Sequence, residues 1–111
     1  MFERSRQGAV DLIHGSDPIT RETAEEFNAV LESCLTSGQP RIVLNMERIP
    51  LLDSHGLETL CDCQQSCISR GGCMKLASVP SLCLDILEAT GVSAMFEVFD
   101  NVLMATGSFA R

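Results

Sequence analysis

The chain has 111 residues, of which 45% are hydrophobic and 21% charged, and this balance predicts one globular domain over residues 1–111. Its formal net charge of −7 argues against nucleic acid as the main ligand, because a phosphate backbone needs a basic face, and against adsorption to anionic lipid. No apolar run is long enough for membrane insertion and no secretory signal stands at the N-terminus, so we expect a cytoplasmic protein.

The first third of the chain predicts two strands followed by a helix. Residues 2–5 favour a short edge strand, and residues 9–14 favour a second strand. Thr20 is predicted to cap a helix whose apolar residues recur at helical spacing as far as Cys34. We expect residues 37–40, which include Gly38 and Pro40, to end that helix.

The middle of the chain predicts a buried strand, a loop and a long helix. Ile42, Val43 and Leu44 form a continuous apolar run, which is typical of a strand covered on both faces. Residues 47–53 read as a loop and residues 54–70 as a helix that a basic residue and two glycines end. The side chains of this helix expected to face inward are Leu57, Leu60, Cys61, Cys67 and Ile68.

The last third continues the alternation. Residues 73–77 predict a strand, and a helix that contains Leu82 and Leu87 follows and closes at Gly91. Residues 96–99 predict a last short strand, after which Asp100 is expected to cap a terminal helix. Strands that alternate with helices place the chain in the α/β class, in which sites lie at the carboxyl ends of the strands.

The segment Asp53-Ser54-His55-Gly56-Leu57 carries the main functional signal, because it stands where a loop after a buried strand meets a helix. The free N–H groups and the dipole at a helix start favour a negative charge, so an exposed serine there suits a phosphate. A simpler interpretation stays open: Asp53 or Ser54 caps the helix and Gly56 relieves crowding.

The pattern Ile-Val-Leu-Asn-x7-Asp-Ser-x-Gly-Leu, residues 42–57, resembles the STAS domain of bacterial anti-sigma factor antagonists. The resemblance continues in family order over residues 23–27, 74–80, 87–92 and 96–100. It implies a STAS fold over the whole chain: a mixed β-sheet of about four to five strands with about four helices packed on it.

The resemblance also implies a function. In this family a partner kinase, which is itself the anti-sigma factor, phosphorylates the serine that follows the aspartate, here Ser54. The unphosphorylated form binds the anti-sigma factor, phosphorylation breaks the complex, and a phosphatase restores it. No catalysis and no cofactor are expected of the chain itself. The residues expected to meet the partner are Asp53, Ser54, His55, Gly56, Leu57, Thr20 and Ser78.

Two positions depart from the family pattern. His55 stands where the family usually has Ser or Thr, and Thr20 stands where many members carry an acidic residue. Both changes bear on the identity of the partner, and neither removes the phosphate acceptor. Small STAS proteins also serve as subunits of stressosomes or of lipid-transport ABC complexes, so an adaptor role is the nearest alternative.

The cysteines suggest a competing function as a metal or redox protein. Cys61-x-Cys63-x3-Cys67 has neither the paired spacing of a structural zinc site nor a C-x-x-C redox pair. Only Cys63 and Cys67 share a helix face, and the interpretation preferred here is that cysteines fill small apolar positions in a reduced compartment. His14 and His55 are expected to be solvated, so no metal site is predicted.

Overall fold

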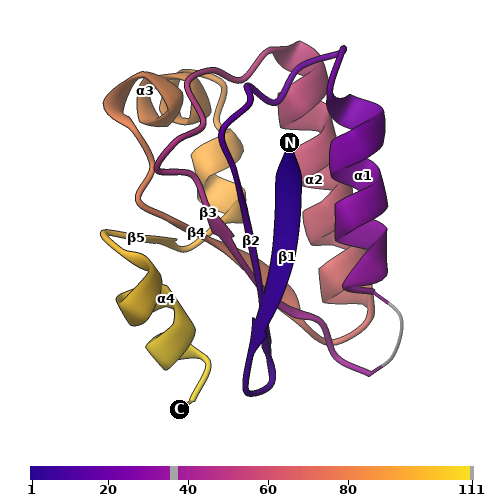
Figure 1. The fold of residues 1–111 in the computed structure, drawn as a ribbon. Helices are drawn as coiled ribbons and strands as arrows, with labels where there is room; N and C mark the ends of the chain where they lie inside the picture. Colours follow the sequence, from indigo (N-terminus) through magenta and orange to yellow (C-terminus); the bar gives the residue numbers. More distant parts are fainter. Residues whose placement is uncertain (36–37, 111) are drawn as a thin grey trace.

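The computed structural model describes residues 1–35 and 38–110. Its sheet has the strand order β1-β2-β3-β4-β5 (Figure 1). β1 pairs with β2 in antiparallel fashion, while β2, β3, β4 and β5 pair in parallel. The sheet is therefore mixed and the class is α/β, as predicted. The strands are β1 (Phe2–Gln7), β2 (Val10–Gly15), β3 (Arg41–Asn45), β4 (Cys73–Ala77) and β5 (Val98–Phe99).

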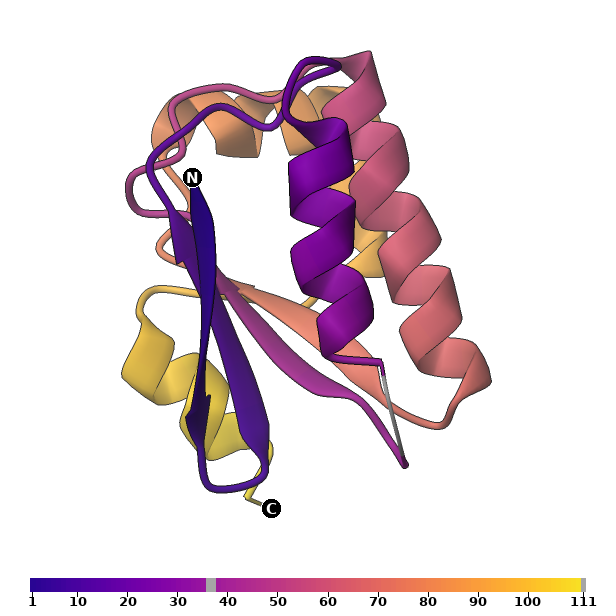
Figure 2. The same ribbon diagram turned by 45° about the vertical axis from the view of Figure 1, so that its right-hand side comes forward.

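The helices divide between the two faces of this sheet. They are α1 (Ala24–Ser33), α2 (Ser54–Ser69), α3 (Ser81–Ala89), the short 3-10 helix η1 (Val92–Met95) and α4 (Val102–Ser108). Helices α1 and α2 lie side by side along one face, and α4 covers part of the other (Figures 1 and 2). The first turns of α1 and α2 meet at the same end of the molecule (Figure 2).

The alternation of side chains along the strands explains two separate apolar layers. The larger layer lies between the sheet and the helices α1 and α2, and its fully buried side chains include Ile13, Leu44 and Phe27. The smaller layer lies under α4; its buried members are Val10, Val43, Ala77 and Ala105, and partly buried apolar side chains pack around them. Helix α4 therefore packs on this smaller layer, whereas α2 is part of the main core.

Helix α1 begins later than predicted. Thr23, not Thr20, occupies the N-cap position, and Ala24 is the first helical residue. The Thr23 hydroxyl accepts a hydrogen bond from the Thr20 N–H at 2.9 Å and donates to the Pro18 carbonyl at 2.7 Å. These bonds fold residues 20–23 into a turn before the helix. Of the predicted stop at 37–40, Ser37 lies outside the described residues, and α1 already ends at Ser33.

The inward face of α2 also differs from the prediction. Ile68 is 58% exposed and Cys61 is only partly buried, while Gln64 is almost fully buried. The Gln64 side chain accepts from the Met74 N–H at 2.8 Å and donates to the Met74 and Met95 carbonyls at 3.1 and 2.8 Å. An apolar pattern cannot reveal this glutamine, because its burial depends on backbone groups of β4 and η1 that only the fold brings near.

The C-terminal third contains two further differences. The predicted strand 96–99 is shortened to Val98–Phe99, and residues 96 and 97 connect it to η1, which ends at Met95. Asn101, not Asp100, caps α4: its side-chain oxygen accepts from the Met104 N–H at 2.8 Å. Both residues are good caps in isolation, and the backbone path after β5 selects the second.

Candidate functional site

Asp53 joins the start of α2 to the loop between β2 and α1. Its Oδ1 accepts from the Gly56 N–H at 2.8 Å, which is an N-cap, and its Oδ2 accepts from the Arg21 N–H at 3.0 Å. The Gly56 N–H is the main group that holds the pKa of this carboxyl below its usual range, and the Arg21 N–H adds to it. An ionised Asp53 is therefore the form that this geometry favours.

Gly56 allows the two loops to lie in direct contact. A Cβ atom at this position would overlap the carbonyl oxygen of Ile19. Around that contact the Ile19 N–H donates to the Leu51 carbonyl at 3.0 Å, and the Asp53 N–H donates to the Ile19 carbonyl at 3.3 Å. Ile19 also forms an isolated parallel bridge with Leu52. The expected role of Gly56, relief of crowding, thus has a specific cause in the backbone of residue 19.

Ser54 is the first residue of α2 and is exposed. Asp53 provides the cap, so the interpretation in which Ser54 caps the helix is wrong and the one in which Asp53 does is confirmed. Within the described part of the chain, no hydrogen bond of the Ser54 hydroxyl is found. The side chain that could accept a phosphate is therefore not used to hold the helix.

Of the other residues expected to meet a partner, three lie at or beside the start of α2, and Ser78 lies elsewhere. His55 is exposed, Leu57 is half-buried against the main core, and Thr20 is half-buried with its hydroxyl donating to Glu22 at 3.0 Å. Thr20 therefore lies in the loop that packs on the start of α2.

Ser78 belongs to a different part of the same sheet edge. Its φ of 54° is left-handed, its N–H donates to the Phe99 carbonyl at 3.0 Å, and its hydroxyl donates to the Asp100 carbonyl at 3.3 Å. These bonds tie Ser78 to the segment between β5 and α4, not to the loop before α2.

Sequence reasoning missed three residues of this region: Ile19, Arg21 and Leu51. Ile19 and Arg21 act through backbone groups, which leave no trace in side-chain patterns. Leu51 is 42% exposed, two residues before Asp53, and is an apolar side chain open to a partner. In the sequence, only the position of Leu51 in a predicted loop, between Pro50 and Leu52, could have indicated that its side chain is exposed.

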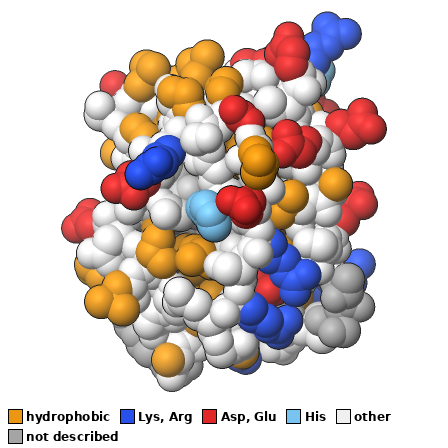
Figure 3. All heavy atoms as spheres, in the orientation of Figure 1, with side chains coloured by type: hydrophobic (Ala, Val, Ile, Leu, Met, Phe, Trp, Pro, Cys, Tyr) orange, Lys and Arg blue, Asp and Glu red, His pale blue; other side chains and the backbone are white. Residues whose placement is uncertain are grey.

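Acidic side chains dominate the neighbourhood of α1. Glu25 and Glu26 stand in its first turn and Glu22 in the turn before it. Figure 3 shows acidic side chains gathered over the upper right of this view of the molecule, where α1 begins. A partner that approaches this end of the molecule meets mainly negative charge.

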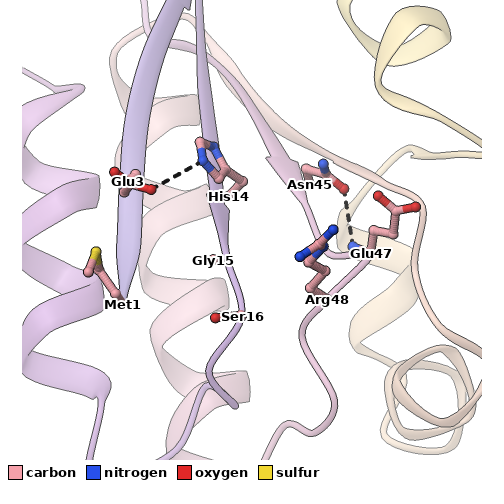
Figure 4. A pocket seen from close by; sticks show the side chains of 8 residues that line it. All are labelled: Met1, Glu3, His14, Gly15, Ser16, Asn45, Glu47 and Arg48. Carbon is pink, nitrogen blue, oxygen red and sulfur yellow. Dashed lines mark hydrogen bonds and ion pairs between the residues drawn. The ribbon is translucent and has the colours of Figure 1, made fainter.

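A polar hollow of about 350 Å³ lies on the sheet face that α1 and α2 leave open (Figure 4). His14 and Glu3, which are partners on the adjacent strands β2 and β1, lie together on one side of it, with 3.5 Å between the imidazole Nε2 and the carboxylate Oε1. Asn45, whose Oδ1 accepts from the Glu47 N–H at 3.1 Å, and Arg48 border the other side. None of the residues expected to meet a partner lines it.

The described part of the chain contains neither a group of side chains that could hold a metal ion nor a helix that could span a membrane. Within residues 1–35 and 38–110, no three His, Cys, Asp or Glu side chains are grouped closely enough to hold a metal ion. Each described helix is also too short or too polar to cross a membrane.

Comparison with known proteins shows the family of the chain. The family model described as the STAS domain matches residues 3–105. A solved structure described as an anti-sigma factor antagonist from Thermotoga maritima has a TM-score of 0.92 and 22% identity, with 99% of this chain and 95% of that chain covered. An anti-sigma-factor antagonist domain protein from Planctomyces limnophilus has a TM-score of 0.87 and 17% identity, covering 99% and 98%.

A transport-related protein shares the fold as well. A sulfate transporter family protein from Wolinella succinogenes has a TM-score of 0.76 and 25% identity, with 91% of this chain and 84% of that chain covered. No match was found among the curated proteins. The fold therefore occurs both in proteins named as anti-sigma factor antagonists and in a protein named for transport.

Proposed function

The chain belongs to the STAS domain family, and on that premise we propose that it is an anti-sigma factor antagonist whose binding is switched by phosphorylation of Ser54. The observation that supports the proposal is that Asp53 and Ser54, which are neighbours in the chain, have different roles. Asp53 caps α2, so the exposed Ser54 hydroxyl is available to a kinase without loss of the helix.

The proposed docking surface surrounds the start of α2 and consists of Leu51, Asp53, Ser54, His55 and Thr20. Leu51 supplies exposed apolar area, and Ser54 and His55 supply polar contacts. Gly56 and Leu57 support this surface from beneath, since Gly56 is buried and Leu57 packs on the core. Ser78 would contact the partner from a separate place, because its hydroxyl donates to the Asp100 carbonyl between β5 and α4.

Phosphorylation would change this surface in two ways. A phosphoserine adds close to two negative charges and three acceptor oxygens. The start of α2 tolerates that charge, because the helix dipole and free N–H groups favour it, so the domain stays folded. A partner that buries Ser54 would have to bury an unpaired phosphate, which is unfavourable. The switch therefore acts on the complex and leaves the fold unchanged.

The proposed partners are an anti-sigma factor that is also the serine kinase, and a phosphatase that removes the phosphate. The chain's own part is binding in the cytoplasm, without a chemical step and without a cofactor. The decisive test is peptide mass spectrometry of residue 54 in protein isolated from its own host, stressed and unstressed. Occupancy that changes with stress supports the switch, and a host protein that never carries phosphate at Ser54 in either state contradicts it.

A second candidate is an adaptor role in a stressosome or in a transport complex, such as a lipid-transport ABC system. The shared fold of the Wolinella succinogenes sulfate transporter family protein favours the transport version. In that role the same surface at the start of α2 would contact a scaffold or an ATPase. Co-purification from native cells separates the two: a small serine kinase supports the first function, and an ABC ATPase supports the second.

A further inference from the structure

Two cysteines of α2, Cys63 and Cys67, stand one helical turn apart on the buried face of the helix. Residues four apart in a helix lie one above the other, so their side chains are neighbours. Cys63 is 6% exposed and Cys67 is fully buried, and both belong to the main core with Cys34 of the α1 end. Cys61, two residues earlier, lies off this face and is half-buried.

The two thiols influence each other's protonation. The neighbouring Cys67 sulfur and burial raise the pKa of Cys63, and the neighbouring Cys63 thiol lowers the pKa of Cys67. The positive charge of Arg70 also lowers the pKa of Cys67, against the effect of burial. Of the two, Cys67 is therefore the thiol that loses its proton more readily, and Cys63 is the one that keeps it.

A groove of about 540 Å³ between α1 and α2 reaches Cys63, whereas Cys67 is fully buried and does not line it. Cys63 forms part of its wall, with Leu31 and Leu35 on the α1 side and Arg70 at the end of α2. A small apolar reagent can therefore contact Cys63 first and reach Cys67 by a side-chain movement within one turn of the helix.

The spacing of the pair suits a bridging atom better than a disulfide. Neighbours four apart on a helix have Cβ atoms about 5–6 Å apart, whereas a disulfide needs Cβ atoms about 3.5–4.5 Å apart. A usual protein metal site requires three or four ligands, and no group of three such side chains occurs among the described residues. The pair therefore fits an acceptor that binds only two sulfur atoms.

We propose that Cys63 and Cys67 form a dithiol site for a soft acceptor that takes two sulfur ligands, specifically a monosubstituted trivalent arsenical. With phenylarsine oxide as the probe, the two S–H bonds break, two As–S bonds form, and the arsenic-bound oxygen leaves with both protons as water. Arsenic stays trivalent and no oxidant or reductant takes part.

The chain supplies its own matched controls. Cys61 is on the same helix but off the buried face, and Cys73 is on β4. Each lacks a second cysteine one helical turn away. The site is also separate from the proposed switch, since Cys63 lies nine residues after Ser54, about 14 Å along the helix. Failure of either proposal therefore leaves the other standing.

The test is a titration of the full chain with phenylarsine oxide, followed by native mass spectrometry in excess glutathione, a competing monothiol. One equivalent should remain bound to the unchanged protein and to Cys61→Ala and Cys73→Ala. Cys63→Ala and Cys67→Ala should each bind weaker by on the order of 100-fold or more, because the second As–S bond is intramolecular. Equal retention by all four variants, or complete release from the unchanged protein, overturns the proposal.

A second measurement does not depend on any variant, which matters because Cys67→Ala leaves a small cavity in the core. The unchanged protein is loaded with phenylarsine oxide, unbound thiols are alkylated, and the peptide between Arg48 and Arg70 is fragmented. Alkylation of Cys61 with protection of Cys63 and Cys67 supports the site. Protection of any other pair contradicts it.

Discussion

The carboxylate of Asp53 accepts a hydrogen bond from the backbone N–H of Arg21, 32 residues earlier in the chain, at 3.0 Å. The same side chain caps α2 through Gly56. One residue therefore fixes both the start of the helix that carries Ser54 and the loop packed beside it. Hydrogen bonds of a single side chain therefore join these two segments, although the region consists mostly of loop residues.

Asp53→Asn should destabilise the protein at neutral pH and make little difference in strong acid. The folded-state pKa of Asp53 lies below its ordinary value, so its ionisation stabilises the fold above the ordinary pKa. That contribution is lost as the pH falls through the lower, folded-state pKa. Urea unfolding midpoints from neutral pH to strong acid should show the two proteins converging at the acid end.

The matched control is Asp100→Asn. Asp100 is exposed and precedes the true cap Asn101, so its replacement should leave the urea midpoint unchanged across the same pH range. If Asp100→Asn and Asp53→Asn behave alike, the hydrogen bonds of Asp53 do not explain its effect.

Gly56→Ala should lower the free energy of unfolding by about 1–3 kcal/mol, because the new Cβ atom overlaps the Ile19 carbonyl and forces the two loops apart. Gly107→Ala is the control: it lies inside α4 with open space around it, and alanine favours a helix over glycine by about 0.5–1 kcal/mol. In thermal unfolding, the melting temperature of Gly56→Ala should lie below that of the unchanged protein and the melting temperature of Gly107→Ala above it. A Gly56→Ala variant as stable as Gly107→Ala would disprove the close contact.

The order of the elements could be predicted from the sequence because each element has a strong local signal. The apolar run at Ile42, Val43 and Leu44 is β3, and the basic residue and glycines after Ser69 end α2 where expected. The STAS resemblance added the mixed sheet, which local patterns do not specify. The exact N-cap residues, Thr23 and Asn101, could not be predicted, since neighbouring residues cap equally well in isolation.

The candidate site was predictable in part. Asp53 and Ser54 stood out as cap residues at a helix start, but only the structure shows which of the two caps. The contact of Gly56 with Ile19 and the bond from Arg21 to Asp53 join segments far apart in sequence through backbone atoms. Side-chain patterns carry no information about such contacts, and the burial of Gln64 escaped prediction for the same reason.

Gln64→Ala should destabilise the protein more than the replacement of a polar residue usually does. It leaves the Met74 N–H and the Met95 carbonyl without their hydrogen-bond partner. Each unsatisfied buried group costs about 1–3 kcal/mol, so the melting temperature should fall by at least roughly 4 °C. Gln65→Ala, one position along and exposed, should change it very little. Differential scanning calorimetry of both variants checks this, and equal melting temperatures would show that the Gln64 bonds contribute nothing net.

Ser54→Ala and Ser54→Glu should leave stability nearly equal and separate only in partner binding. Ser54 is exposed and Asp53 holds the cap, so neither change removes a contact that supports the fold. A glutamate at a helix start is favourable by about 0.3–1 kcal/mol, which is a small gain in stability. In a binding titration with the kinase partner recovered from native cells, the alanine variant should bind constitutively and the glutamate variant poorly. Equal affinity of the two variants would show that Ser54 is not part of the docking surface. A lower melting temperature of the alanine variant would show that Ser54, like Asp53, supports the helix.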